Sequence, residues 1–475
     1  MQPYITYISY YKNNEYKDNM KKIQLYTILL AAPLLNGCGI YTRYSRPDLD
    51  VCTDSLYRTP VAEKDSGTVA SKPWRELFTD PHLQALIATG LERNTDFGIA
   101  RLQVEEAQAV LTNARLSYLP SVSLAPQAGI SRYNGETKKT YNIGGTASWE
   151  VDLFGRVTNA KRGAAASLEQ SRAYAQAVQT QLVATIAESY YTLLMLDEQL
   201  AISNETRANW EETITTLEAL AQAGKTDDVA IHRARASRTA LDASTLTLRK
   251  NISETENALS ALLKEPAHTI SRSTLADQHF SDDLSVGLPL QLLANRPDVR
   301  QAEAALAEAF YATHAARSAF YPRLTLSGSL GWTNSGGGAI LNPGKWLSST
   351  IASLTAPLFN KGTNIANLKI AQARQQEATL RFEQALLDAG KEVNDALTEW
   401  QTADGRIHLD RRQIADLETA TEKTRLLVRY TSANYLEVLT AQQSLLNARL
   451  TLAQDRIGKI QAVVHLYHAL GGGME

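Results

Sequence analysis

The sequence predicts an α+β fold in which long helices are combined with four β-strands, and in which one structural repeat occurs twice. Three observations support this prediction: a segment that recurs at constant spacing, two pairs of segments with alternating polarity, and long stretches without helix-breaking residues. Alternating polarity is typical of strands with one apolar face, and constant spacing is typical of a duplicated structural unit.

The repeat is visible in residues 94–120 and 296–322, which lie about 202 residues apart. Each segment has an aspartate near its start, Asp96 or Asp298, and ends in a proline closely preceded by an aromatic residue. A constant offset over the whole segment indicates duplication. The alternative is a chance likeness between two helices rich in alanine and glutamate. We disfavour it because the aspartate and the aromatic residue before proline are not general helix features.

Each of these prolines begins a segment in which apolar and polar residues alternate. From Tyr141 to Leu153 the alternation holds over thirteen residues, and a similar pattern runs from Leu324 to Trp332. Period-two alternation is typical of a strand that presents one apolar face. The predicted strands span residues about 121–132, about 140–153, about 323–332 and about 346–358.

The two strands of each pair are separated by a predicted loop, Arg132–Lys139 or Asn334–Lys345. Segments of about ten residues with aromatic residues near their ends are typical of outer-membrane strands. Four strands do not close a barrel, and a free strand edge cannot lie in lipid. If these strands span a membrane, several chains must combine them: two chains give eight strands, and three give twelve with a wider lumen. A soluble sandwich of two hairpins is disfavoured, because the helical remainder would have to cover it.

Long helices account for most of the remaining chain. Residues 164–223 contain neither glycine nor proline, and no proline follows residue 357. A helix of about 60 residues extends roughly 90 Å. Positions near the C-terminus repeat in steps of three and four, which predicts a heptad seam that packs lengthwise against other helices. The seam consists of Leu436, Leu439, Gln443, Leu446, Leu450, Ala453, Ile457, Ile460, Val464 and Tyr467.

The N-terminal region is typical of a bacterial lipoprotein signal. A basic segment at residues 20–22 precedes an apolar stretch, Ile23–Leu35, which ends close to Cys38. This pattern predicts a signal peptide over residues 1–37, with residues 1–19 an artefact of start-site assignment. Cys38 would carry diacylglycerol and an acyl chain, and residues 38–72 would form a lipidated linker. The alternative is a buried structural thiol.

Several other classes of function find little support in the sequence. Cys52 is the only cysteine besides Cys38, so no intrachain disulfide framework is predicted. No transmembrane helix is predicted outside the signal. The net charge of −2 argues against a nucleic-acid partner. His465 and His468 share a helix face, but no neighbouring carboxylate or cysteine in the sequence suggests a metal site. We therefore predict neither enzymatic activity nor a cofactor, apart from the lipid on Cys38.

Three stretches resemble one known family. These stretches are residues 74–96, residues 288–303 with the signature Arg296-Pro297-Asp298, and residues 434–443. They are similar to the outer membrane factor family, the TolC-like channels of tripartite efflux pumps, and in particular to its lipoprotein branch. The resemblance covers roughly residues 70–470, with a first structural repeat at 73–287 and a second at 288–475.

The resemblance implies a homotrimer whose 12 strands form one barrel in the outer membrane, above a long antiparallel α-helical barrel that extends into the periplasm. It also implies a passive exit channel for drugs or other toxic compounds. The implied partners are a periplasmic adaptor (membrane fusion protein), an inner-membrane RND transporter and outer-membrane lipid. The implied location is the bacterial outer membrane, with a lipid anchor.

The resemblance further implies a gate at the periplasmic end. Asp228 is similar to the acidic gate position of the first repeat, Glu437 to one of the second, and Tyr430 to the aromatic residue that bonds across the gate. The family pattern is incomplete here, because Thr440 and Thr431 replace an acidic residue and a glycine. A ring of carboxylates would favour passage of cations. In the alternative, Asp228 is a capping or first-turn acid of a helix and Glu437 is a solvated flank of a coiled coil.

Three other functions remain open at this point. Within the same family, the chain could be the duct of a type I protein-secretion system, which its genomic neighbours would reveal. Outside the family, it could be a non-conducting structural lipoprotein that forms coiled-coil bundles. It could also be a lipid-anchored binding module, which would be monomeric in detergent.

Overall fold

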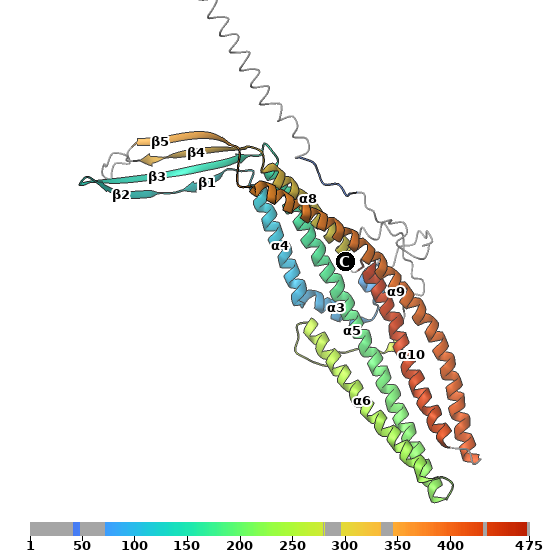
Figure 1. Cartoon of the computed structure of the whole chain (residues 1–475). Coiled ribbons are helices and arrows are strands. Elements are labelled where there is room, and N and C mark those ends of the chain that lie inside the picture. The colour runs from blue at the N-terminus through green and yellow to red at the C-terminus, as the bar shows by residue number, and fades with distance from the viewer. Residues whose placement is uncertain are drawn as a thin grey trace, which may run out of the picture. The chain divides into compact units, whose positions relative to one another are not determined.

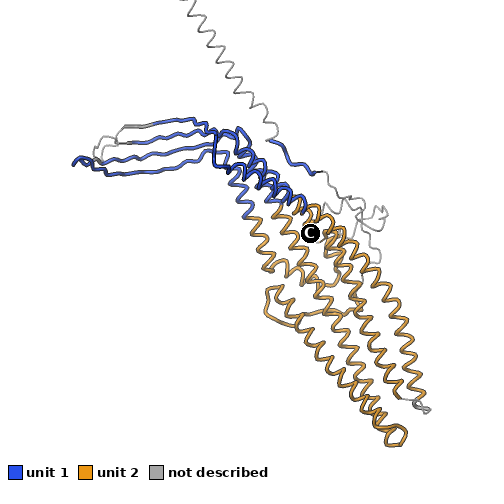
Figure 2. Tube along the Cα trace, viewed as in Figure 1, with its two compact units in different colours: residues 1–48, 106–169, 304–380 blue, residues 49–105, 170–303, 381–475 orange. Residues whose placement is uncertain are grey.

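The computed structural model describes residues 41–47, 72–278, 280, 296–333, 345–430 and 435–472. The chain divides into two compact units (Figure 2). Unit 1 consists of Met1–Asp48, Glu106–Glu169 and Ala304–Leu380, and unit 2 of Leu49–Glu105, Gln170–Glu303 and Arg381–Glu475. The units do not coincide with the two sequence repeats, because each unit contains segments from both.

The predicted combination of long helices and a small set of strands is confirmed (Figure 1). Helices α5 and α9 have 67 and 68 residues, which corresponds to about 100 Å each. None of the described helices has an apolar stretch long enough to cross a membrane. The helical elements are α2 (Trp74–Leu77), α3 (Pro81–Arg93), α4 (Thr95–Leu116), α5 (Arg156–Gln222), α6 (Asp228–Leu262), the 3-10 helix η5 (Leu275–Asp277), α8 (Pro297–Ser318), α9 (Thr363–Tyr430) and α10 (Tyr435–Ala469).

Unit 1 contains one antiparallel sheet. Its strands are β1 (Ser121–Leu124), β2 (Gln127–Tyr133), β3 (Glu136–Val151), β4 (Arg323–Thr333) and β5 (Lys345–Thr355). Their order is β1-β3-β4-β5, and β2 pairs with β3 beyond β1. The first predicted strand is therefore two strands, separated at Pro126, because proline has no N–H to donate to the ladder. The pairing of β3 with β4, from Asn142↔Thr333 to Val151↔Leu324, joins the two repeats.

The predicted loop Arg132–Lys139 is wrong. Strand β2 continues to Tyr133 and β3 begins at Glu136, so only Asn134 and Gly135 lie between them. Both have a positive φ, 47° and 81°, which a type I′ hairpin turn requires. The Asn-Gly pair was the sequence signal for this tight turn. Most of the second predicted loop, residues 334–344, lies outside the described residues, and the last strand ends at Thr355 rather than near residue 358.

Helix α10 packs lengthwise in unit 2, largely through its predicted seam. The seam positions Leu446, Ala453, Ile457, Ile460, Val464 and Tyr467 are buried. Leu436 and Gln443 are exposed instead, which corrects the prediction for the first part of the helix. Gln442 is buried in that region, and its Nε2 donates to Oγ1 of Thr213 on α5 at 3.2 Å. In this first part of α10, the buried residues are Val438, Leu439 and Gln442, so the predicted seam holds there only at Leu439.

The signature residue Arg296 is a buried anchor of unit 2. Its Nη1 donates to the carbonyl of Ala469 at 2.7 Å, and its Nη2 binds Glu392 at 2.7 Å and Asp298 at 2.5 Å. Arg296 thus connects the start of α8 with α9 and with the end of α10. Burial alone would raise the pKa of Asp298, but the bonds and the charge of Arg296 keep that pKa below its ordinary value. Pro297 is the first residue of α8, where a missing N–H costs nothing.

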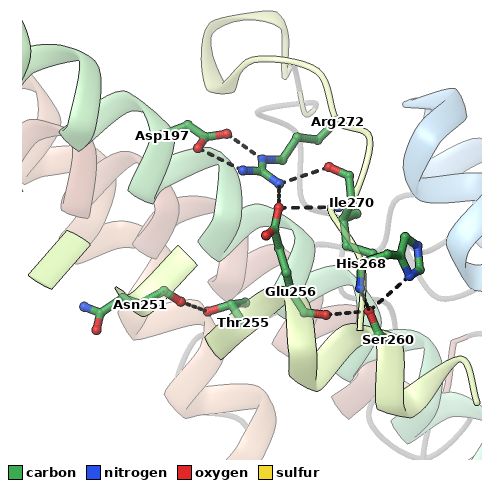
Figure 3. A network of polar contacts seen from close by, with 8 residues as sticks. All are labelled: Asp197, Asn251, Thr255, Glu256, Ser260, His268, Ile270 and Arg272. Carbon is green, nitrogen blue, oxygen red and sulfur yellow. Dashed lines mark hydrogen bonds and ion pairs between the residues drawn. The ribbon is translucent and has the colours of Figure 1, made fainter. Parts of the chain in front are cut away.

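A second, partly buried anchor fixes the segment that follows α6 (Figure 3). Arg272 binds Asp197 of α5 and Glu256 of α6, both at 2.5 Å, and donates to the carbonyl of Ile270 at 3.0 Å. The hydrogen bond to Asp197 is the main cause that raises the pKa of Arg272, so this guanidinium stays charged. These charge-assisted bonds hold the segment after α6 against both α5 and α6.

Two aspartates meet between α9 and α10. Asp410 and Asp455 are both buried, and Nε of Arg406 donates to Asp455 at 2.9 Å. Oδ2 of Asp410 has no hydrogen-bond donor among the described residues. Burial, and then the neighbouring Asp455, raise the pKa of Asp410 above its ordinary value. Protonation of Asp410 therefore stabilises this helix pair.

Asp410→Asn should remove a pH-dependent loss of stability. A carboxyl whose pKa is raised in the folded state stabilises at low pH, and this contribution is lost as the pH rises through the raised pKa. Relative to the wild type, the melting temperature of Asp410→Asn should therefore increase more at pH 8 than at pH 5. Circular dichroism of the detergent-purified protein measures this difference. The exposed Asp416→Asn is the control, and an equal response of both variants would contradict the assignment.

Candidate functional site

The sheet of unit 1 has one apolar and one polar face. Paired residues lie on the same face, so the printed registers assign every strand position to one side. The polar face has hydroxyl pairs such as Ser123–Thr146 and Ser329–Ser349, each 2.8 Å apart, with Ile351 as an apolar exception. The apolar face consists mainly of Val122, Leu124, Ile130, Tyr141, Ile143, Trp149, Val151, Leu324, Leu326, Leu330, Trp332 and Leu354.

Both faces of this sheet are uncovered in the single chain. Val122 is 77% exposed and Leu354 is 62% exposed, and Gly331 is the only buried residue among the described side chains of the five strands. An apolar surface of this extent is stable only against protein or lipid. The two outer edges are also unpaired within the described sheet, because β1 and β2 pair only with β3 and β5 pairs only with β4. Their backbone groups need partners if the sheet lies in lipid.

Side-chain contacts fix the junction between strand β3 and helix α5. The carboxylate of Asp152 accepts hydrogen bonds from the backbone N–H of Val157 at 3.1 Å and of Thr158 at 2.7 Å. These two donors are among the free N–H groups that every helix start leaves. Next to this cap, the ring of Phe154 stacks on Tyr321 with 4.9 Å between centroids. The corner therefore holds the strand in a fixed direction relative to the start of its helix.

Residues 41–47 are bound at this corner, which the sequence did not reveal. The hydroxyl of Tyr41 donates to the carbonyl of Asp152 at 2.9 Å and accepts from the N–H of Gly155 at 3.1 Å. Nη1 of Arg162 donates to the carbonyl of Tyr41 at 2.9 Å. The predicted lipidation residue Cys38 itself lies outside the described residues. The chain three residues after it is fixed where strand β3 ends.

The predicted gate residue Asp228 lies in the first turn of α6, at the end of the α5–α6 hairpin. Its side chain is exposed. The helix cap is the preceding residue, Asp227, which accepts from the N–H of Ala230 at 3.1 Å. Capping was one alternative role for Asp228, and the structure assigns that role to Asp227. Gly224, with φ of 67°, allows the chain to reverse between the two helices.

The predicted gate residues of the second hairpin are only partly described. Glu437 is exposed in the first turn of α10, and Tyr430 is the last residue of α9, with its side chain outside the described part. Thr431 lies outside the described residues as well. The hydroxyl of Thr440 donates to the carbonyl of Leu436 at 2.9 Å, within its own helix. Among the described side chains, none forms a hydrogen bond or ion pair with Asp228 or Glu437, so the single chain does not bring these acids together.

An apolar cluster joins α10 to the α5–α6 hairpin. It contains Trp210 and Leu217 of α5, Ile231 of α6 and Leu439 of α10, and Tyr435 packs against it. Burial is the main cause that raises the pKa of Tyr435. The sequence marked Leu439 as a seam residue but gave no signal for its partners, which lie more than 200 positions earlier in the chain.

His465 has two carboxylate neighbours, which corrects the prediction that none was near. Its Nε2 lies 3.2 Å from Glu188 of α5, and its Nδ1 lies 3.0 Å from Glu399 of α9. The hydrogen bond to Glu188 is the main cause that raises the pKa of His465 to about 9, so the ring is cationic at neutral pH. A protonated imidazole has no lone pair for a metal. No group of three potential metal ligands occurs among the described residues. His465 thus forms an ionic link between three helices.

Comparison with known proteins gives consistent results. The family model "Outer membrane efflux protein" matches residues 86–264 and 288–472, one segment in each half of the chain. The cation efflux system protein CusC of Escherichia coli strain K12 is 30% identical over 443 residues, which is 92% of this chain and 97% of CusC. The probable outer membrane lipoprotein SilC of Salmonella typhimurium is 28% identical over 96% of this chain and 99% of its own length.

Solved structures of channels are also similar. A crystal structure of CusC, 29% identical, aligns with a TM-score of 0.82 over 91% of this chain and 99% of that chain. The open state of the MtrE outer membrane channel of Neisseria gonorrhoeae, 28% identical, aligns with a TM-score of 0.83 over 91% and 98%. The predicted family, outer-membrane location and efflux function are thereby confirmed. The chain belongs to the outer membrane efflux protein family and is an outer-membrane channel for efflux.

Proposed function

We propose that this protein is the passive exit channel of a tripartite efflux pump and that it works as a homotrimer. The amphipathic single-layer sheet with two free edges carries this proposal. Each chain supplies four strand positions, because β1 and β2 follow one another along the same edge. Three chains then supply twelve strands, enough for a wide lumen, whereas the interior of eight strands is largely filled by side chains.

The two faces of the sheet determine its orientation in this barrel. The apolar face contacts lipid, and the hydroxyl-rich face lines an aqueous lumen. The paired helices α5–α6 and α9–α10 would form an α-helical barrel in the periplasm. The two interhelical turns would contact a periplasmic adaptor and an inner-membrane RND transporter, which supplies the energy. Relatives that are named as parts of a cation efflux system and of a solvent efflux pump support these partners.

The proposed cargo is a small toxic compound. The described side chains of the hydroxyl-lined face form no specific ligand set, so selection among substrates would rest with the transporter. Cations are a second candidate, since CusC is named as part of a cation efflux system. The relatives are channel or efflux proteins, and we propose that this chain likewise has no catalytic activity and no cofactor.

The lipid anchor is part of the proposal. Cys38 would become the mature N-terminus with diacylglycerol and an acyl chain. The segment that begins at Tyr41 is bound at the end of strand β3, which supports an anchor close to that end of the sheet. SilC is also named as a lipoprotein.

Cys38→Ser should abolish lipid labelling. Cells supplied with a palmitate analogue should label the wild type and the control variant Cys52→Ser, but not Cys38→Ser. Mass spectrometry of the mature N-terminus gives the same answer independently. Equal labelling of Cys38→Ser and the wild type would place the modification elsewhere.

Asp228 and Glu437 are proposed to restrict the channel, together with Tyr430. Three chains would place six carboxylates around the periplasmic opening, although the single chain keeps them apart. Replacing both acids by alanine removes the charge that attracts cations into the constriction, and it removes the acceptors through which the copies would bond to one another there.

The double variant Asp228→Ala, Glu437→Ala should conduct several-fold better than the wild type in planar bilayers, with weaker cation selectivity. The exposed Asp416→Ala is the matched control and should conduct like the wild type. Unchanged conductance of the double variant would remove the gate assignment and leave the channel intact. An intact trimer without any conductance would argue against the channel itself.

A further inference from the structure

The repeat places two related surfaces in each half of the chain. Residues 94–120 correspond to residues 296–322, so the end of α4 corresponds to the end of α8. A Leu-Phe pair also follows the second strand of each hairpin: Leu153-Phe154 precedes α5, and Leu358-Phe359 precedes α9. Each repeat therefore has a first surface, formed by the helix before the proline, and a second surface, formed by the Leu-Phe pair and the long helix that follows.

Within the chain, the second surface of the first repeat (Leu153-Phe154 and α5) packs against the first surface of the second repeat (the end of α8). Phe154 stacks on Tyr321 with an interplanar angle of 18°. The guanidinium of Arg162 on α5 lies 5.9 Å from the ring centroid of Tyr311 on α8. Strands β3 and β4 continue the same junction as a paired ladder. These contacts all lie within unit 1.

The two remaining surfaces, one from each repeat, are uncovered. Leu358 is 98% exposed and Phe359 is 86% exposed, whereas Phe154 is half-buried. On the opposite surface, Leu116 of α4 is 57% exposed, and its counterpart Ser318 of α8 is 3% exposed. Equivalent residues of the two repeats thus differ in their exposed fraction. Each of the two exposed surfaces lacks the neighbouring surface that its equivalent has within the chain.

The exposed Leu-Phe pair is held on a defined corner. Nδ2 of Asn360 donates to Oδ1 of Asn364 at 2.7 Å, and Nδ2 of Asn364 donates to the carbonyl of Ala319 at 2.9 Å. Lys361 adopts a φ of 57°, which a residue with a side chain rarely does. A strained and hydrogen-bonded turn that presents two large apolar side chains to solvent is typical of a contact surface.

We propose that Leu358 and Phe359 of one copy pack against Leu116 and Leu119 of the next copy, as Phe154 packs against Tyr321 within one chain. The occupant is a second copy because the chain already contains this contact once, and because both complementary surfaces remain exposed. Leu119 corresponds to Tyr321 in the repeat, and it is itself exposed. Such a head-to-tail contact closes a ring when the rotation between copies permits it.

This inference rests on the proposed homotrimer and adds the residues that join its copies. It also predicts that the free edge of β5 pairs with the free edge of β1 and β2 of the next copy, as β4 pairs with β3. The apolar corner would then exclude water from the end of the ladder between copies, where strand meets helix.

Cysteine cross-linking tests the contact. The double variant Phe359→Cys, Leu119→Cys, in a Cys52→Ser background, should form dimers and trimers on a denaturing gel after treatment with a short bis-maleimide. The matched control is Phe154→Cys, Tyr321→Cys, which should link within one chain and migrate as a monomer. Phe359→Cys alone should not link copies.

Native mass spectrometry of the same samples separates the two proposals. A trimer in which Phe359→Cys, Leu119→Cys forms no link between copies, while the control pair links, would overturn this contact and leave the proposed channel standing. A monomeric protein would overturn the homotrimer and the contact together. Phe359→Ser provides a second readout, because it should lower the temperature at which the trimer dissociates while helical circular dichroism stays unchanged.

Discussion

The need to satisfy strand edges and to cover an apolar sheet face determines most of this structure. A strand edge in lipid leaves N–H and C=O groups without partners, at a cost of several kcal/mol for each group. The sheet of unit 1 has two such edges and one uncovered apolar face. In the proposed homotrimer, pairing with further copies satisfies both edges, and lipid covers the face. The proposed barrel and the orientation of its lumen follow from this constraint.

Duplication provides the surfaces that this arrangement needs. The junction of β3 and β4 shows how one repeat meets the next, with Phe154 on Tyr321 at its end. Using the same junction between copies requires no new type of contact. The long helices are then fixed to one another by charged side chains such as the buried Arg296 and the partly buried Arg272, which hold particular helix positions together more specifically than an apolar seam does.

Local patterns in the sequence were sufficient for the long helices and for the positions of most strands. The Asn134-Gly135 turn was also readable, but the polar character of the surrounding residues suggested a longer loop. Distant contacts were not readable. The glutamates beside His465 lie on two other helices, and Asp227 rather than Asp228 caps α6. A single sequence contains the periodicity of each helix, but it does not say which faces of separate helices meet.

The central claim is that the apolar face of the sheet contacts lipid and the polar face contacts water. Nitroxide labels at Val122 and Ser123 of β1, and at Leu354 and Ser353 of β5, compare adjacent positions on opposite faces. Electron paramagnetic resonance of the protein in lipid vesicles should show Val122 and Leu354 more accessible to oxygen, and Ser123 and Ser353 more accessible to a water-soluble nickel complex. Equal accessibility of both faces to the nickel complex would contradict a membrane-spanning sheet.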